Sequence, residues 1–339
     1  MKSKVNRLIK FTQLFVKVVR KSRVRWYSCR KSKHTYRQYQ HLVILGLMKY
    51  LRTDYRGVIE RLECMPGIMA AIGLYQLPHY TTIHKFLQRF SRYRFDRILS
   101  HSIDLFNTGN CILAIDGTGY STSRFSSYYS MRTGKHESRK SIVQSIATVN
   151  TANLSIASHH SCNRWGHENT FFKPLVLRAS RKLSIRYVVA DKAYDSEINH
   201  EWVSDVIGAR SIIPVRRGWK NGTVIGYHRE RLAKRFNNRI YHRRSLVETV
   251  FSVIKKRFDS SLQSRSLVQQ NKEVGLLCVV YNVYRCVSIN CSIIYRCFLH
   301  GLYRIDTVKL TEIKKQPELI ALFEFLTAFF IYWTAAPTH

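Results

Sequence analysis

The clearest shortage in this sequence of 339 residues is of acidic side chains. It has 21 Asp and Glu against 56 Lys and Arg, which gives a formal net charge of +35. No acid occurs between Met1 and Thr53. Solubility does not need so large an imbalance, so the sequence predicts a polyanionic partner.

Long apolar runs and paired cysteines are also lacking. No uncharged apolar stretch is long enough to cross a bilayer, and Lys17, Arg20 and Lys21 interrupt the N-terminal segment that a signal peptide would need. The eight cysteines include no CxxC pair, so the common zinc ligand sets are not indicated. We therefore expect a nucleic acid as the partner, no membrane association, and a cytoplasmic, nucleoid-associated location in a reducing compartment.

Three regions are predicted from the pattern of apolar residues. Residues 1–105 are basic and read as helices. Residues 106–290 alternate strand and helix patterns, which is typical of an α/β core. Residues 291–339 form a helical C-terminal tail.

One helix in the first region has the pattern of a DNA-recognition helix. It follows Pro78, and Thr81 or Thr82 is expected to cap it. Its apolar side carries Ile83, Phe86, Leu87 and Phe90. Its opposite side carries His84, Lys85, Gln88 and Arg89. A helix-turn-helix recognition helix packs one face on its domain and lays the other on DNA, but an ordinary amphipathic helix with a solvated basic face fits equally well.

Two acids follow short apolar runs in the second region. Cys111–Ile115 leads to Asp116, and Arg186–Ala190 leads to Asp191. If these runs are parallel neighbouring strands, both carboxylates emerge at the carboxyl edge of the sheet, where α/β proteins bind ligands. Bare carboxylates repel phosphate, whereas Mg²⁺ binds carboxylate and phosphate oxygens together. For either aspartate alone, capping of the next helix is the more ordinary explanation.

A long helix is indicated from Arg235 to Arg257. One face of it, an arc of about 80°, carries Tyr241, Arg244, Glu248, Phe251 and Lys255. The adjoining stripe, Leu246, Val247, Val250 and Ile254, is expected to pack on the sheet. An exposed helix with an Arg–Glu pair four residues apart is the plain alternative.

The order and spacing of these segments resemble a known family. The pattern Tyr-x2-Arg-x3-Glu-x6-Lys follows Ala-Ile-Asp116-Gly-Thr-Gly and Val-Val-Ala-Asp191-Lys-Ala-Tyr-Asp, and the whole is similar to DDE transposases of prokaryotic insertion sequences. His167-Glu168-Asn169 and Tyr281-Asn282-Val283-Tyr284-Arg285 agree with it. The resemblance covers roughly residues 78 to 287.

This resemblance implies an α/β protein with a ribonuclease-H-like mixed sheet flanked by helices, and an N-terminal helical DNA-binding region. Asp116 would lie on the first strand, Asp191 on the fourth, and Glu248 on a later helix. These three are the expected catalytic residues and metal ligands, for two Mg²⁺ ions with Mn²⁺ as a substitute. Asp195 is a rival for the second ligand, but it lacks the strand-end position.

The resemblance also predicts the reaction and its partners. We expect an insertion-sequence transposase that binds element ends, cleaves DNA and joins strands by two-metal phosphoryl transfer. Its partners would be double-stranded DNA (terminal repeats and target) and further copies of itself. Tyr241, Arg244 and Lys255 would hold phosphates near the metals, and His84, Lys85 and Arg89 would contact DNA from the N-terminal region. A ribonuclease-H-like nuclease without strand transfer and a catalytically silent DNA-binding derivative are the alternatives.

Overall fold

The structure of this protein is a computed structural model that describes residues 6–106, 109–122, 142–162, 168–217 and 223–308, with side chains up to residue 289. The chain divides into two compact units, Met1–Val287 and Ser288–His339. The predicted tail, 291–339, falls in the second unit. Its residues up to 308 are helical, and 309–339 lie outside the described residues.

The N-terminal region is helical, as its apolar spacing predicts. Its helices are α1 (Arg7–Lys21), α2 (Gln38–Tyr50), α3 (Tyr55–Glu63), α4 (Pro66–Ile72), α5 (Tyr80–Arg89) and α6 (Arg92–Ser102), followed by a short 3₁₀ turn η1 (Ile103–Leu105). Helix α2 is buried on nearly all sides, so the other helices pack around it. In the described residues, no helix combines the length and the apolarity that crossing a membrane requires.

Helix α5 is the predicted recognition helix, and its two faces are as expected. Ile83, Phe86 and Leu87 are buried, whereas the polar face is exposed. The predicted cap is wrong. The helix begins at Tyr80 with His79 at the N-cap position, and no side chain caps it. The hydroxyl of Thr81 is instead 2.8 Å from Nδ1 of His79.

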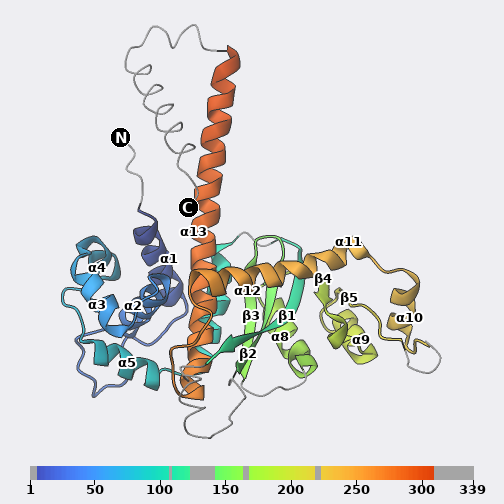
Figure 1. The fold of residues 1–339 in the computed structure, drawn as a ribbon, viewed down its shortest axis with the longest axis horizontal. Coiled ribbons are helices and arrows are strands. Elements are labelled where there is room, and N and C mark those ends of the chain that lie inside the picture. Colours follow the sequence, from blue (N-terminus) through green and yellow to red (C-terminus); the bar gives the residue numbers. More distant parts are fainter. Residues whose placement is uncertain (1–5, 107–108, 123–141, 163–167, 218–222, 309–339) are drawn as a thin grey trace, which may run out of the picture. The chain divides into compact units, whose positions relative to one another are not determined.

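Five strands form one mixed sheet in the order β3-β2-β1-β4-β5 (Figure 1). They are β1 (Cys111–Ser121), β2 (Ile142–Asn150), β3 (Ser155–Cys162), β4 (Ile185–Ala190) and β5 (Arg210–Ile212). The first three are antiparallel neighbours, while β4 and β5 run parallel to β1. This confirms the mixed sheet flanked by helices that the sequence predicts, with β5 as an additional short strand.

Helices cover both faces of the sheet. On one face, α8 (Phe172–Ser180) and α9 (Glu197–Asp205) pack with Leu113, Ile115 and Ala190 into one buried apolar cluster. The other face contacts α12 (Ser245–Arg257) and the first part of α13 (Leu267–Val308). Side chains alternate along a strand, so residues 114, 116, 118 and 120 of β1 point toward α12.

The predicted long helix from Arg235 to Arg257 is in fact interrupted. After α10 (Tyr227–Lys234), the chain forms a short α11 (Asn238–Tyr241), a 3₁₀ turn η4 (His242–Arg244) and then α12. The side chain of Asn237 caps α11 by accepting the N–H of Ile240 at 3.0 Å. Two further 3₁₀ turns precede α8 and follow β4, namely η2 (Glu168–Phe171) and η3 (Lys192–Tyr194).

A buried ion pair ties the N-terminal helices to α13. Lys49 of α2 binds the carboxylate of Glu273, and both side chains are almost completely buried. A buried pair is costly to break, because the remaining charge loses its partner without gaining water.

We expect Lys49→Met to lower the free energy of unfolding by about 3–5 kcal/mol, because it leaves the Glu273 carboxylate buried without a cation. Lys21→Met is the matched control. It removes an ion pair to Asp104 in which the lysine is half exposed, and such pairs contribute about 1 kcal/mol or less. Urea denaturation of both variants would measure the difference, and equal losses would contradict the assignment.

Candidate active site

Asp116 and Asp191 lie side by side where the pairing of β1 with β4 ends. Ile115 is the register partner of Ala190, so an aspartate comes next on each chain. Because side chains alternate along each strand, both aspartates belong to the face that α12 covers. Neighbouring strands are about 4.8 Å apart, which brings the two carboxylates within reach of a shared ligand.

One detail of the sequence prediction is wrong. Strand β1 does not end before Asp116 but continues to Ser121. The antiparallel partner β2 keeps its register with β1 from Asp116↔Ala147 to Ser121↔Ile142, which sustains the strand after β4 has ended. Only Asp191 therefore stands at a strand end, where it is exposed and precedes η3.

Arg244 joins the first aspartate to the predicted third carboxylate. Its Nη1 donates to Oδ2 of Asp116 at 2.6 Å, and its Nη2 lies 2.9 Å from Oε1 of Glu248. Burial raises the pKa of Asp116, although the N–H of Gly117 and the charge of Arg244 act in the opposite direction. The adjacent charges of Glu168 and Glu248 raise it further. The carboxylates of Asp116 and Glu248 thus share the guanidinium of Arg244.

Lys255 lies along the same face of β1. Its Nζ donates to the hydroxyl of Thr118 at 2.7 Å and is 5.5 Å from the ring centroid of Tyr120. Partial burial lowers its pKa. Tyr241 lies one turn before Arg244, with its ring 5.3 Å from that of Phe236. The sequence pattern placed these residues on one helical face, and the structure brings Arg244 and Lys255 to β1 despite the break in the helix.

A fourth carboxylate, Glu168, reaches this end of the sheet from the α8 side. Its Oε1 accepts a hydrogen bond from Nε2 of Gln144 at 2.6 Å, and its Oε2 accepts one from the hydroxyl of Tyr194 at 2.9 Å. It lies directly against Gly117, where the three atoms nearest to an added Cβ would all belong to Glu168. Glu168 therefore connects β1, β2 and the turn after Asp191.

The sequence contained one signal for Glu168. The triplet His167-Glu168-Asn169 supported the family resemblance, but it gave no reason to assign Glu168 a place in the site. His167 lies outside the described residues. Only the fold reveals the contact with Gly117, because the two residues are 51 positions apart in the chain (168 − 117).

Asp195, the rival for the second ligand, is bound on all sides by protein groups. His200 Nε2 is 3.1 Å from its Oδ1, while the guanidinium of Arg229 and the N–H of Arg216 donate to Oδ2 at 3.0 Å and 2.7 Å. Together these contacts outweigh burial and lower the pKa of Asp195. Its side chain is completely buried. This placement favours a structural role and leaves Asp191 as the accessible acid.

The predicted DNA-contacting residues of the N-terminal region lie on the open face of α5. His84, Lys85 and Arg89 are exposed. The ring of His84 meets that of Tyr55 edge-on at 5.3 Å, and Nε of Arg89 donates to the carbonyl oxygen of Lys85 at 3.2 Å. No acidic side chain in the described part of the chain forms an ion pair with these three residues.

The described residues contain no ready-made cluster of three or more His, Cys, Asp or Glu side chains that could hold a metal ion. The donors that the sequence predicts are nevertheless close together. Asp116 and Asp191 are adjacent in register, and Asp116 and Glu248 converge on Arg244. Asp116 and Glu248 therefore share the single positive charge of Arg244.

The comparison with protein families agrees with the motifs. A family model described as a transposase DDE domain matches residues 107–283. Among solved structures, a cryo-EM structure of the piggyBac transposase synaptic complex with hairpin DNA aligns with 100% of this chain and 84% of that chain, at 12% identity and a TM-score of 0.47. No curated protein sequence matches this chain.

The packing of Glu168 against Gly117 gives a test that does not depend on activity. We expect Gly117→Ala to lower the free energy of unfolding by about 1–3 kcal/mol, because the new methyl group pushes the Glu168 carboxylate away from its donors. In a Glu168→Ala background the same change should be neutral, or stabilising by up to about 1 kcal/mol, since alanine suits a strand better than glycine. Urea denaturation of all four proteins gives the coupling. Equal changes in the free energy of unfolding in both backgrounds would contradict the contact between Gly117 and Glu168.

Proposed function

Because this chain belongs to the family of transposases with a DDE domain, we propose that it binds the ends of an insertion sequence, cleaves the DNA there and joins the freed strand to a target. The observation that carries this proposal is the convergence of Asp116, Asp191 and Glu248 at one end of the β1–β4 pair. The excess of basic residues supplies the complementary charge for DNA.

The donor set fits divalent ions of the hard type. Carboxylate oxygens are the ligands that Mg²⁺ and Mn²⁺ prefer, and Asp116, Asp191 and Glu248 would provide them. Two ions held there would activate a water or a 3′-hydroxyl and stabilise the leaving oxygen. Asp116 and Glu248 already share the charge of Arg244, which supports a site that requires positive charge.

The cationic residues have separate tasks in this proposal. Arg244 would exchange its carboxylate partners for a DNA phosphate, so that its charge stays paired while the acids bind metal. Lys255, anchored at Thr118 two residues beyond Asp116, would contact a neighbouring phosphate. Tyr241, which lies one turn before Arg244, would position the same DNA strand. None of these three transfers a proton in the reaction.

The N-terminal region, residues 1–105, would recognise the element ends. Its first 53 residues carry no acid, and α5 presents His84, Lys85 and Arg89 to solvent from a well-packed helix. A rigid helix with an exposed polar face is suited to the major groove. Recombination requires two ends to be held together, so we expect the protein to act as an oligomer on DNA.

Strand transfer distinguishes this function from its alternatives. We expect the full-length protein to join a pre-cut end duplex with a free 3′-hydroxyl to a target plasmid in Mg²⁺ or Mn²⁺, with the ends taken from the inverted repeats beside the gene. EDTA should abolish the reaction, and excess Mg²⁺ should restore it. Gel electrophoresis would detect the joined product. Cleavage without joining would make the protein a nuclease, and binding with neither step would make it a silent derivative.

The three carboxylates should behave alike when their charge is removed. Asp116→Asn, Asp191→Asn and Glu248→Gln should each slow strand transfer at least about 10³-fold, roughly 4 kcal/mol in the barrier. DNA binding should persist, because each change makes the chain more basic. Glu201→Gln, an exposed glutamate of α9, is the matched control and should react normally.

The phosphate-contacting lysine should behave differently from the acids in the same assay. Lys255→Ala should weaken DNA binding and make its salt dependence shallower, while partial activity persists at low salt. Circular dichroism would check that all variants are folded. Near-normal turnover in Glu248→Gln would show that Glu248 does not belong to the active site.

A further inference from the structure

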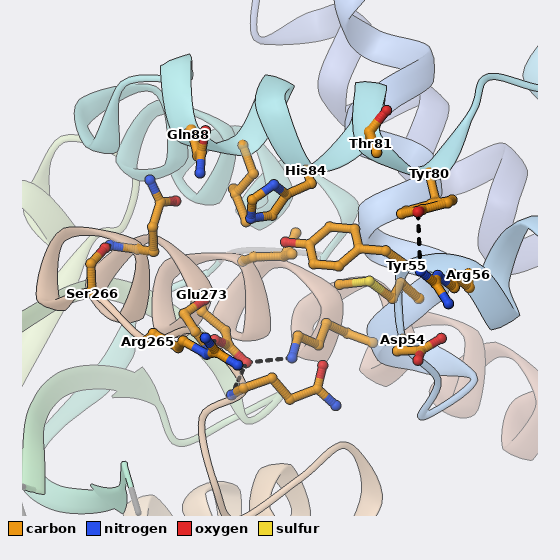
Figure 2. Close-up of a pocket in the computed structure, with 17 residues that line it drawn as sticks. Asp54, Tyr55, Arg56, Tyr80, Thr81, His84, Gln88, Arg265, Ser266 and Glu273 are labelled. Carbon is orange, nitrogen blue, oxygen red and sulfur yellow. Dashed lines mark hydrogen bonds and ion pairs between the residues drawn. The ribbon is translucent and has the colours of Figure 1, made fainter. Parts of the chain in front are cut away.

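A cavity of about 670 Å³ opens beside the recognition helix (Figure 2). Thr81, His84 and Gln88 line it from α5, and residues 263–266, which follow α12, line it from another side. In Figure 2 the side chains of His84 and Gln88 project from α5 into this space, and Arg265 and Ser266 belong to the facing segment. The facing segment, residues 263–266, is named the 263–266 loop. The cavity that it lines together with α5 is named the α5–loop cleft.

Two consecutive residues of α13 fix the walls of the α5–loop cleft. Lys272 Nζ donates to the carbonyl oxygen of Gln88 in the last turn of α5 at 2.8 Å. Glu273 accepts the backbone N–H groups of Gln263 and Ser264 at 3.0 Å and 2.9 Å. Because both α13 side chains are buried, α5 and the 263–266 loop are held at a set distance from each other.

The acids that line the α5–loop cleft already have partners. Asp54 accepts the N–H of Gly57 at 2.7 Å as the cap of α3, and Glu273 is neutralised by Lys49. Arg265 is exposed, and no carboxylate in the described ranges forms an ion pair with it. Asp54 keeps its negative charge, because its partner is a neutral N–H group, but the lining carries three cations (Lys49, Arg56 and Arg265) against two acids (Asp54 and Glu273), so its net charge is positive.

The walls contain apolar side chains such as Met48, Leu87 and Leu276, together with polar groups of the kind that bind a nucleic-acid backbone. Arginine guanidinium, serine hydroxyl and glutamine amide groups all donate to phosphate oxygens, and such contacts fix the register of a protein on a duplex. Arg265, Ser266 and Gln269 supply them from the loop side. The α5 helix and the 263–266 loop line opposite sides of one cleft. Duplex DNA that lies against the exposed face of α5 would therefore also come close to the 263–266 loop.

We propose that the α5–loop cleft takes the sugar-phosphate backbone of the same DNA duplex that α5 reads, and that Arg265 is its principal phosphate contact. The recognition surface is then built from two segments more than 170 residues apart, and one of them follows the helix that carries Glu248 after only the five residues 258–262. This inference rests on the proposed function for the contact between α5 and DNA and for the identity of that DNA as an element end.

Leu262, which directly precedes the 263–266 loop, connects this surface to the candidate active site. The N–H of Leu262 donates to the carbonyl oxygen of Ser121 at 2.9 Å, at the end of the strand that carries Asp116. A phosphate held by Arg265 would thus be anchored to the β1 end of the catalytic sheet as well as to α5. DNA bound there would have a defined register relative to the cleavage point.

The test compares Arg265→Ala with Arg181→Ala in the full-length protein. Arg181 is an exposed arginine just after α8, outside the cleft, so both variants lose one positive charge. Fluorescence anisotropy would measure the affinity for an end duplex and for a scrambled duplex over a series of KCl concentrations. We expect Arg265→Ala to bind both duplexes roughly tenfold more weakly, with a log–log salt slope shallower by about 0.9.

Phosphate ethylation interference identifies the contact itself. Ethylation of the phosphate that Arg265 contacts should impair binding of the wild type and of Arg181→Ala, but not of Arg265→Ala. If Arg265→Ala and Arg181→Ala have equal affinities and slopes, or if only the end duplex is affected, the phosphate assignment is overturned. Loss of the Arg265 effect alongside normal strand transfer refutes this inference alone. An Arg265 effect without any metal-dependent cleavage refutes the proposed function alone.

Discussion

The rest of the site depends on one charge balance, the guanidinium of Arg244 between the carboxylates of Asp116 and Glu248. Three acids at one end of a sheet repel each other. The side chain of Asp116 is only 17% exposed, and this burial raises its pKa, which the charges of Glu168 and Glu248 raise further. A cation from η4 relieves this repulsion and also holds the start of α12 against β1. The same requirement for positive charge makes the site a suitable place for divalent ions, since they can replace the guanidinium without leaving any acid unbalanced.

Much of this arrangement could be predicted from the sequence because it depends on periodicity. An apolar run followed by Asp116, a second run followed by Asp191, and a helical face with Arg244, Glu248 and Lys255 are local patterns. Parallel pairing of β1 with β4 then makes the two aspartates neighbours without any further information. The exposed and buried faces of α5 followed from the same reasoning, because a period of 3.6 residues divides a helix into faces wherever its ends lie.

The errors occurred where tertiary contacts override local signals. Residues 116–121 do not look like a strand continuation, yet β2 keeps them extended by pairing on one side only. The segment before Ser245 has a helical pattern and begins at the polar Asn237-Asn238, as expected, but the η4 turn interrupts it. Glu168 could not be assigned from sequence because its position depends on Gly117, Gln144 and Tyr194, which meet only in the folded chain.

Glu168 and the pair Lys272–Glu273 illustrate how a few polar contacts set the geometry of a much larger surface. Glu168 holds the active-site end of the sheet from the face opposite to Asp116. Lys272 and Glu273 hold α5 and the segment after α12. Each of these side chains makes at least two hydrogen bonds, and Lys272 and Glu273 make theirs while buried, where unpaired groups would be costly, so each favours a single arrangement. In the proposed function, cleavage at a fixed distance from the recognised sequence requires a constant distance between α5 and β1. Lys272 and Glu273 attach α5 to the 263–266 loop, and the preceding residue, Leu262, hydrogen-bonds the end of β1, all within the compact unit Met1–Val287.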